Sequence, residues 1–207
     1  MKLLLLGATG RVGSHVLTHA LEDGHEVTVL VRSPDKLSHV LAENLRVLTG
    51  NVLEKSDVAA AMRGMDAVIS ALNTDGTTTL SKGTPIIIEA MKQEGVPRII
   101  TVGTAGILKS RISPELLRYQ SSESKQKLTR AAEEHHKAYE LLAGSGLAWT
   151  IVCPTYLPDG IYTGTFRVEA DYLPEGGAQI SVPDTAACTY QQLASLDYVR
   201  TRVGIAY

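Results

Sequence analysis

The sequence is poor in cysteine and has no strong excess of either charge. Its two cysteines, Cys153 and Cys188, lie far apart and form no CxxC pair, so no cysteine motif for a metal or for redox work is present. We predict two buried, reduced thiols. The 20 Lys and Arg residues nearly balance the 22 Asp and Glu residues, which argues against a concentrated basic face. Nucleic acid and membrane surfaces are therefore not expected partners.

Long apolar segments are also lacking. The N-terminal MKLLLLGATG is too short for the core of a signal peptide and runs directly into a glycine turn, which indicates a buried strand. With 44% hydrophobic and 20% charged residues, the composition is typical of a globular domain. We expect a single domain over residues 1–207 in a cytoplasmic protein.

Short apolar runs alternate with segments of helical periodicity along the first three quarters of the chain. The strand-like runs are KLLLLG, EVTVLV, LRVLTG, DAVISAL, RIITVG and AWTIVC. Helices are predicted over 11–22, 36–42, 55–63, 80–94 and 128–143. Because the strands are apolar along their whole length, this order predicts an α/β fold with a doubly wound, Rossmann-like parallel sheet covered on both faces.

The alternation breaks after Pro154. Residues 163–182 are typical of a hairpin around the turn Pro-Glu-Gly-Gly, and Asp184 is predicted to cap a helix that runs to about Leu196. The fold should therefore carry a small C-terminal extension of strand and helix. The polar stretch 109–127, interrupted by Pro114, is the best candidate for a mobile loop over a site.

The motif GATGRVG follows the first strand and opens the first helix. Gly7 permits a tight turn, Gly10 lets the backbone approach a pyrophosphate, and Gly13 lets helix and strand pack closely. The helix N-terminus favours the anion. We interpret this segment, with Thr9, Arg11 and Val12, as a dinucleotide cradle rather than an unliganded turn.

A basic residue ends the second strand, where an acid that binds the ribose 2′-hydroxyl is typical of NAD sites. Arg32 lies 25 residues after Gly7 (32 − 7), and no carboxylate takes its place. An arginine favours the 2′-phosphate of NADP through charge-assisted hydrogen bonds, with Ser33 as a further donor and Arg11 as a second charge. The alternative is a solvated surface charge.

Further candidates follow the other strands, because ligands lie at the carboxyl ends of strands in open α/β sheets. Thr104 and Tyr156 are the catalytic candidates, since a hydroxyl near the nicotinamide can donate a hydrogen bond or relay a proton. Ordinary polar turn residues are the alternative. His135 and His136 are predicted to be solvated, with no third ligand at metal spacing. The remaining cofactor candidates are Asn51 and Val52 beside the adenine, Ala71, Leu72 and Asn73 beside the middle of the cofactor, and Pro154 and Thr155 beside the nicotinamide.

The order of motifs resembles the flavin reductases also called biliverdin IX beta reductases, which are atypical short-chain dehydrogenases close to NmrA-like proteins. The resemblance covers nearly the whole chain and rests on GATGRVG, EVTVLVRSPDKL, GNVLE, DAVISAL, SKGTPIIIEAMKQEGVPRII, GSGLAWTIVCPT and ISVPD. It implies an NADPH-dependent reductase whose acceptor lies against the nicotinamide in an open cleft. Thr104 stands where the vertebrate reductase has serine, Tyr156 where it has histidine, and Asn51 replaces an aspartate.

The Tyr-x-x-x-Lys pair of ordinary short-chain dehydrogenases is absent. The corresponding positions hold Ala131 and His135. An alcohol dehydrogenase needs that tyrosine to exchange a proton with the carbinol oxygen, whereas reduction of a flavin or quinone can take its proton from solvent. The expected acceptors are therefore FMN, FAD, riboflavin, biliverdin or a quinone. A non-enzymatic, NmrA-like NADP sensor is the alternative, and a sugar-nucleotide epimerase is disfavoured by the missing pair.

Overall fold

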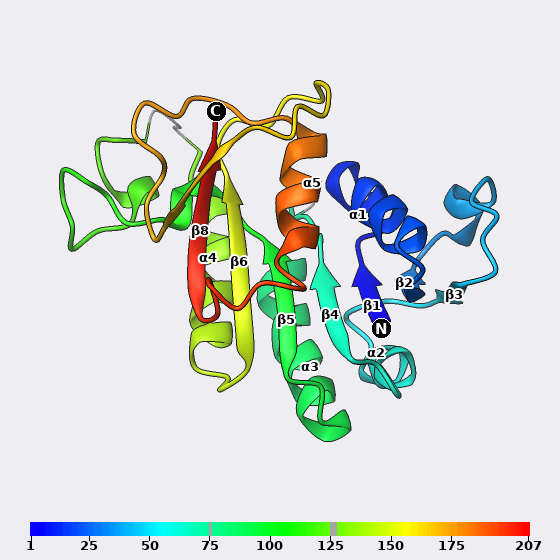
Figure 1. Ribbon diagram of the computed structural model, residues 1–207. Coiled ribbons are helices and arrows are strands. Elements are labelled where there is room, and N and C mark those ends of the chain that lie inside the picture. Colours follow the sequence, from blue (N-terminus) through cyan, green and yellow to red (C-terminus); the bar gives the residue numbers. More distant parts are fainter. Residues whose placement is uncertain (75, 125–127) are drawn as a thin grey trace.

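The computed structural model describes residues 1–74, 76–124 and 128–207, which fold around one twisted sheet (Figure 1). The order of the strands across the sheet is β3-β2-β1-β4-β5-β6-β8-β7. Every pair is parallel except β7 with β8. The strands are β1 (Lys2–Leu6), β2 (Glu26–Val31), β3 (Leu45–Thr49), β4 (Ala67–Ser70), β5 (Arg98–Val102), β6 (Ala148–Pro154), β7 (Arg167–Ala170) and β8 (Thr201–Ala206).

Helices cover both faces of the sheet. Leu3 and Leu5 of β1 face one apolar cluster, with α1 (Arg11–Glu22) and α5 (Val182–Gln191). Leu4 and Leu6 face the other, with α2 (Lys55–Met62), α3 (Thr79–Glu94) and α4 (Arg130–Ala143). Because successive residues of a strand point to opposite faces, two covered faces require an uninterrupted apolar strand, which is the pattern of β1. The predicted α/β fold with a doubly wound, mostly parallel sheet is confirmed.

The helix predicted over 36–42 is wrong. The segment forms only a single 3-10 turn, η1 (Pro34–Leu37). Leu37 is buried, but Leu41 is 93% exposed, so a longer helix would have no apolar face to pack on the sheet.

The hairpin predicted over 163–182 is also wrong. β7 pairs antiparallel with β8, which the sequence analysis missed, and β8 in turn lies parallel beside β6. The helix that follows begins at Val182 and ends at Gln191, and its N-cap is Ser181 rather than Asp184. Strands that lie far apart in sequence, as β7 and β8 do, carry no local residue pattern that predicts their pairing, whereas a turn such as Pro-Glu-Gly-Gly predicts a hairpin.

Two features bear on function by what they exclude. Within the described residues, no helix has both the length and the apolarity that a bilayer crossing needs. Cys153 and Cys188 are free, buried thiols, as predicted, and burial raises the pKa of each to about 12. A thiol with so high a pKa is a poor nucleophile and a poor metal ligand at neutral pH.

Candidate cofactor cleft

An open cleft of about 420 Å³ lies at the carboxyl ends of β1, β2, β3 and β4. It spans the point where the strand order reverses, with β2 on one side of β1 and β4 on the other. Open α/β sheets bind ligands at such a point. Ten of the residues predicted from the sequence line it: Gly7, Thr9, Gly10, Arg11, Arg32, Asn51, Val52, Ala71, Leu72 and Asn73.

The glycine turn at the base of the cleft leaves no room for side chains. Gly7 has a φ of 82°, and a Cβ there would lie 2.5 Å from the Ala71 carbonyl oxygen. A Cβ on Gly13 would lie 2.1 Å from the Gly7 carbonyl oxygen, so α1 packs directly on the end of β1. Gly10 precedes α1, and its N-cap position provides no side-chain hydrogen bond. The first turn of α1 thus presents its amides to the cleft, the arrangement that binds an anion.

The β2 end of the cleft is basic. Arg32 and Lys36 both line it, and no Asp or Glu of the described chain is among the lining residues. This charge suits the 2′-phosphate of NADP better than a bare ribose hydroxyl. Lys36 was not predicted as a cleft residue, because the helical pattern over 36–42 includes it. The turn signal Ser33-Pro34, followed by Lys36, would have placed it beside Arg32. Ser33 itself is exposed and does not line the cleft.

Arg11 takes a different place from the one predicted. Its guanidinium donates to the Leu157 carbonyl oxygen and to Asp159 Oδ1, each at 2.8 Å. Both partners lie in the loop after β6, and β6 stands on the side of β1 opposite to β2. Arg11 therefore turns toward the loop after β6 and away from the β2 end of the cleft, where it was predicted to be a second charge beside Arg32.

The residues after β3 and β4 use their polar groups to shape turns. Asn51 donates its backbone N–H to Asp57 Oδ2 at 2.9 Å and accepts from the Leu53 N–H at 3.1 Å. Asn73 accepts from the Thr74 N–H at 2.7 Å. Val52 lines this part of the cleft together with the apolar side chains of Leu30, Leu53 and Leu72.

The remaining predicted residues lie beside the cleft or beneath it. Val12 and Gly13 are buried in α1. Thr104 follows β5, is half-buried, and accepts a long hydrogen bond of 3.4 Å from the Gly106 N–H. Tyr156 is 68% exposed after β6. Thr104 and Tyr156, with Pro154 and Thr155, thus continue the same edge of the sheet past the cleft, where the nicotinamide end of a cofactor would extend.

The two histidines of α4 are not solvated as predicted. His136 is half-buried, and its Nδ1 lies 3.0 Å from the Tyr119 hydroxyl. His135 is half-buried and lines a water-sized cavity with Ser70, Thr84 and Thr101. Burial lowers the pKa of His135 to about 4, against a smaller opposing effect of Glu134. His135 is therefore neutral at pH 7 and cannot replace the charge of a catalytic lysine.

The two tyrosines nearest to this region are engaged elsewhere. Tyr119 contacts His136 through its hydroxyl, and the Tyr139 ring packs edge-on against Trp149 with the Arg202 guanidinium over its face. Neither lines the cofactor cleft. Thr104 does not line that cleft either, and the Tyr119 Cβ and the Thr104 Cγ2 lie 3.5 and 3.6 Å from the Cβ position of Gly106, so Tyr119 lies beside the end of β5.

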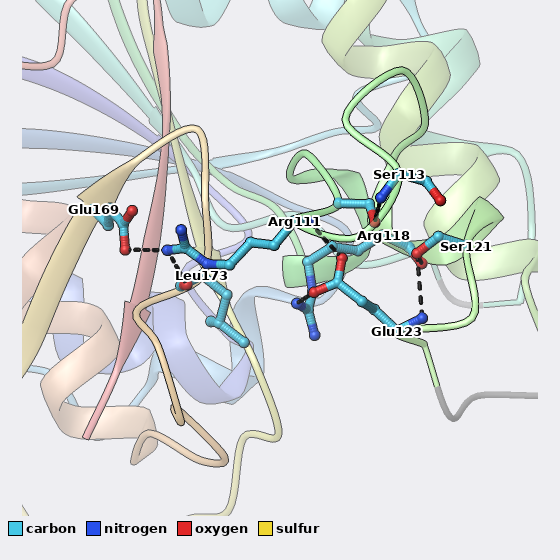
Figure 2. A network of polar contacts seen from close by, with 8 residues as sticks. Arg111, Ser113, Arg118, Ser121, Glu123, Glu169 and Leu173 are labelled. Carbon is cyan, nitrogen blue, oxygen red and sulfur yellow. Dashed lines mark hydrogen bonds and ion pairs between the residues drawn. The ribbon is translucent and has the colours of Figure 1, made fainter.

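The predicted mobile loop is held in place over its described part, 109–124 (Figure 2). Arg111 donates to Glu169 of β7 at 2.5 Å and to the Leu173 carbonyl oxygen at 3.0 Å. Glu123 accepts from the Arg111 N–H at 2.7 Å and pairs with Arg118 at 3.0 Å. Residues 125–127 lie outside the described residues. These contacts join the segment to the sheet edge, and its mobility stays a prediction.

Comparisons with known proteins agree with this geometry. A family model described as NAD(P)H-binding matches residues 7–195. A Bacteroides thetaiotaomicron structure described as a candidate epimerase is 32% identical, with a TM-score of 0.86 over 100% of this chain and 96% of that one. The anaerobilin reductase ChuY of Escherichia coli O157:H7 is 25% identical, with a TM-score of 0.80 over 100% and 97%. An NAD(P)H azoreductase of Xenophilus azovorans is 26% identical over 92% of this chain and 63% of that protein. The chain therefore belongs to the NAD(P)H-binding family, which supports NADP(H) as its cofactor.

Proposed function

We propose that this protein is an NADPH-dependent reductase that transfers a hydride to a planar, conjugated acceptor, namely a flavin, a tetrapyrrole or a quinone. The observation that carries the proposal is that Ala131 and His135 stand at the positions of the catalytic tyrosine and lysine, in a chain with a basic dinucleotide cleft. A carbonyl substrate needs a proton delivered to its oxygen at the site. A conjugated ring system spreads the negative charge it gains and can take its proton from water.

The cofactor half of the site rests on charge and on close backbone approach. Arg32 and Lys36 would hold the 2′-phosphate, and the turn from Gly7 to Gly13 would hold the pyrophosphate against the N-terminus of α1. A Cβ at Gly7 or Gly13 would collide with backbone, so the cradle depends on glycine at both positions. Bound NADPH supplies the hydride from its nicotinamide.

The acceptor half lies at the ends of β5 and β6. Thr104 and Tyr156 would orient the nicotinamide and the acceptor through their hydroxyl groups, because both follow strands at the same edge of the sheet. Tyr156 is exposed and Thr104 is half-buried, so an acceptor could reach both side chains from solvent. The names of two relatives, the anaerobilin reductase and the azoreductase, support this class of acceptor, since both anaerobilin and azo compounds are conjugated, whereas the third relative is described as a candidate epimerase.

The test is oxidation of NADPH by the purified protein with FMN, biliverdin or a quinone, followed by the decay of NADPH absorbance. We expect acceptor-dependent turnover that Arg32→Ala weakens through the KM for NADPH. Tight NADPH binding without turnover on any of these acceptors would instead favour the NmrA-like sensor.

A further inference from the structure

Asp184 is a fully buried carboxylate that joins three segments of the chain. Its Oδ1 accepts from the backbone N–H groups of Thr163 at 3.0 Å and Gly164 at 2.9 Å. Its Oδ2 accepts from the Thr163 hydroxyl at 2.7 Å and the Tyr207 hydroxyl at 2.6 Å. The Ser181 hydroxyl is a fifth donor, 3.2 Å from Oδ2, so the roughly four acceptor positions of the carboxylate are all used.

The surroundings keep this group ionised. Burial alone would raise the pKa of Asp184, but hydrogen bonds from Tyr207, Thr163 and the Gly164 amide together lower it below its ordinary value. Asp184 also lies in the first turn of α5, where the helix dipole favours an anion. Losing the carboxylate would leave buried donors without partners, so the group is a firm attachment point.

The segment that Asp184 holds is the loop 157–165, between β6 and β7. The Val182 N–H donates to the Pro158 carbonyl oxygen at 3.0 Å, and the Ser181 hydroxyl to the Ile161 carbonyl oxygen at 2.9 Å. Gly160, with a φ of 61°, packs so closely that a Cβ there would lie 2.9 Å from that of Ser181. The loop therefore rests on the N-terminal end of α5.

The same loop reaches the cofactor cleft through Arg11. Leu157 and Asp159 accept both hydrogen bonds of the Arg11 guanidinium, and Arg11 lines the cleft. The side chains of Arg11 and Asp159 are 55% and 87% exposed, so this ion pair cannot hold the loop by itself. Asp184 holds the end of the loop at Thr163 and Gly164, and Ser181 and Val182 hold its middle. The loop in turn orients Arg11.

We propose that Asp184 is a positioning residue for the cofactor, which acts through loop 157–165 to place Arg11 at the pyrophosphate side of the cleft. The inference rests on the cofactor site proposed above. It concerns binding of the dinucleotide and does not depend on which acceptor is reduced.

The variants that test it separate the loop contact from the helix. Asp184→Asn keeps the shape but replaces one acceptor oxygen with an NH₂ group. Thr163→Val removes one donor from the loop side, and Thr163→Ser restores it. Thr189→Val is the matched control, because Thr189 is buried in the same helix and its hydroxyl donates only to the Thr185 carbonyl oxygen at 2.7 Å.

Two ligands report on different parts of the cleft. NADP⁺ spans it, whereas adenosine 2′-monophosphate has no pyrophosphate and probes only the Arg32 end. We expect Asp184→Asn to weaken NADP⁺ binding about tenfold with no change for adenosine 2′-monophosphate. Thr163→Val should lose less NADP⁺ affinity than Asp184→Asn does. The NADP⁺ affinities of Thr163→Ser and Thr189→Val should match that of the parent. Amide hydrogen exchange over residues 157–165 should be faster in Asp184→Asn than in the parent, and unchanged in Thr189→Val.

Each outcome decides between the proposals. An unchanged NADP⁺ affinity in Asp184→Asn, or an equal loss for both ligands, would overturn the positioning role. A parent protein that binds neither ligand would overturn the cleft assignment and the positioning role together. A parent that binds both ligands but oxidises no NADPH with any acceptor would overturn the reductase proposal alone. The affinities of Asp184→Asn for NADP⁺ and for adenosine 2′-monophosphate would still test the positioning role of Asp184.

Discussion

Arg11 Nε donates to Asp159 Oδ1 at 2.8 Å and thereby joins the first turn of α1 to the loop after β6, across 148 positions of sequence. Both side chains are largely exposed, at 55% and 87%. Exposed ion pairs contribute little to stability, because water and salt screen them. The value of this contact therefore lies in where it places a positive charge, beside the glycine turn.

Arg11→Ala should separate binding from stability. We expect the free energy of unfolding in denaturant to change by less than about 1 kcal/mol, since the pair is exposed. Affinity for NADP⁺ should fall about tenfold, because a charge near the pyrophosphate is lost. Calorimetric titration and chemical denaturation measure the two quantities. A large loss of stability with unchanged affinity would assign Arg11 to the fold alone.

Arg32→Ala and Lys36→Ala should each reduce the preference for NADP⁺ over NAD⁺. A hydrogen bond to a charged group contributes roughly 1.5 to 3 kcal/mol, so the dissociation constant for NADP⁺ should rise about 10- to 100-fold while that for NAD⁺ stays nearly constant. Lys92→Ala, an exposed lysine in the last turn of α3, is the control. Equal affinities of the parent for both dinucleotides would contradict the assignment of the basic end.

Gly10→Val should abolish dinucleotide binding and leave the circular dichroism spectrum unchanged. The position has an ordinary φ of −85°, and the nearest atom to a Cβ is the Gly7 carbonyl oxygen at 3.2 Å, so the fold can adapt. The added side chain would occupy the space that the pyrophosphate needs. Gly144→Ala, at the end of α4 with contacts of 3.5 Å or longer, is the tolerant control. Binding retained by Gly10→Val would place the pyrophosphate elsewhere.

Thr104→Ala and Tyr156→Phe should each slow turnover with NADPH and FMN about tenfold, near 1.4 kcal/mol of barrier, if the proton comes from water. An obligatory general acid would cost on the order of 10² to 10⁴-fold when removed. Steady-state rates across pH distinguish the two roles. A loss of the larger size in Tyr156→Phe, with NADPH affinity unchanged, would make Tyr156 the proton donor.

His135 should make the protein less stable in mild acid. Its pKa is about 4 in the folded protein, and an unfolded histidine titrates near 6.5, so the unfolded state binds more protons between these values. Stability is therefore full above pH 6.5 and falls as the pH drops towards 4, by up to roughly 3 kcal/mol. Denaturation of the parent and of His135→Gln at several pH values isolates this contribution. If the free energies of unfolding of the parent and of His135→Gln change with pH in the same way, His135 is not buried as a neutral group.

The half of the fold built from adjacent elements followed from the sequence. Strands β1 to β6 and helices α1, α2, α3 and α4 were predicted, because strand and helix periods are local, and both faces of the sheet are covered. The glycine turn and Arg32 marked the cleft for the same reason, since a turn between a strand and the following helix is specified by a few neighbouring residues.

Tertiary structure alone decided the rest. β8 lies between β6 and β7, and nothing within Thr201–Ala206 specifies either neighbour. Burial beside a small cavity that α3, β4, β5 and β6 also line lowers the pKa of His135, and Arg11 turns to Asp159 because a loop 148 residues away offers two acceptors. Asp184 was predicted as a helix cap, but its partners come from a loop and from the C-terminal residue. Residue type and spacing determined where a dinucleotide could bind, whereas the direction and ionisation of each side chain depend on contacts between distant segments.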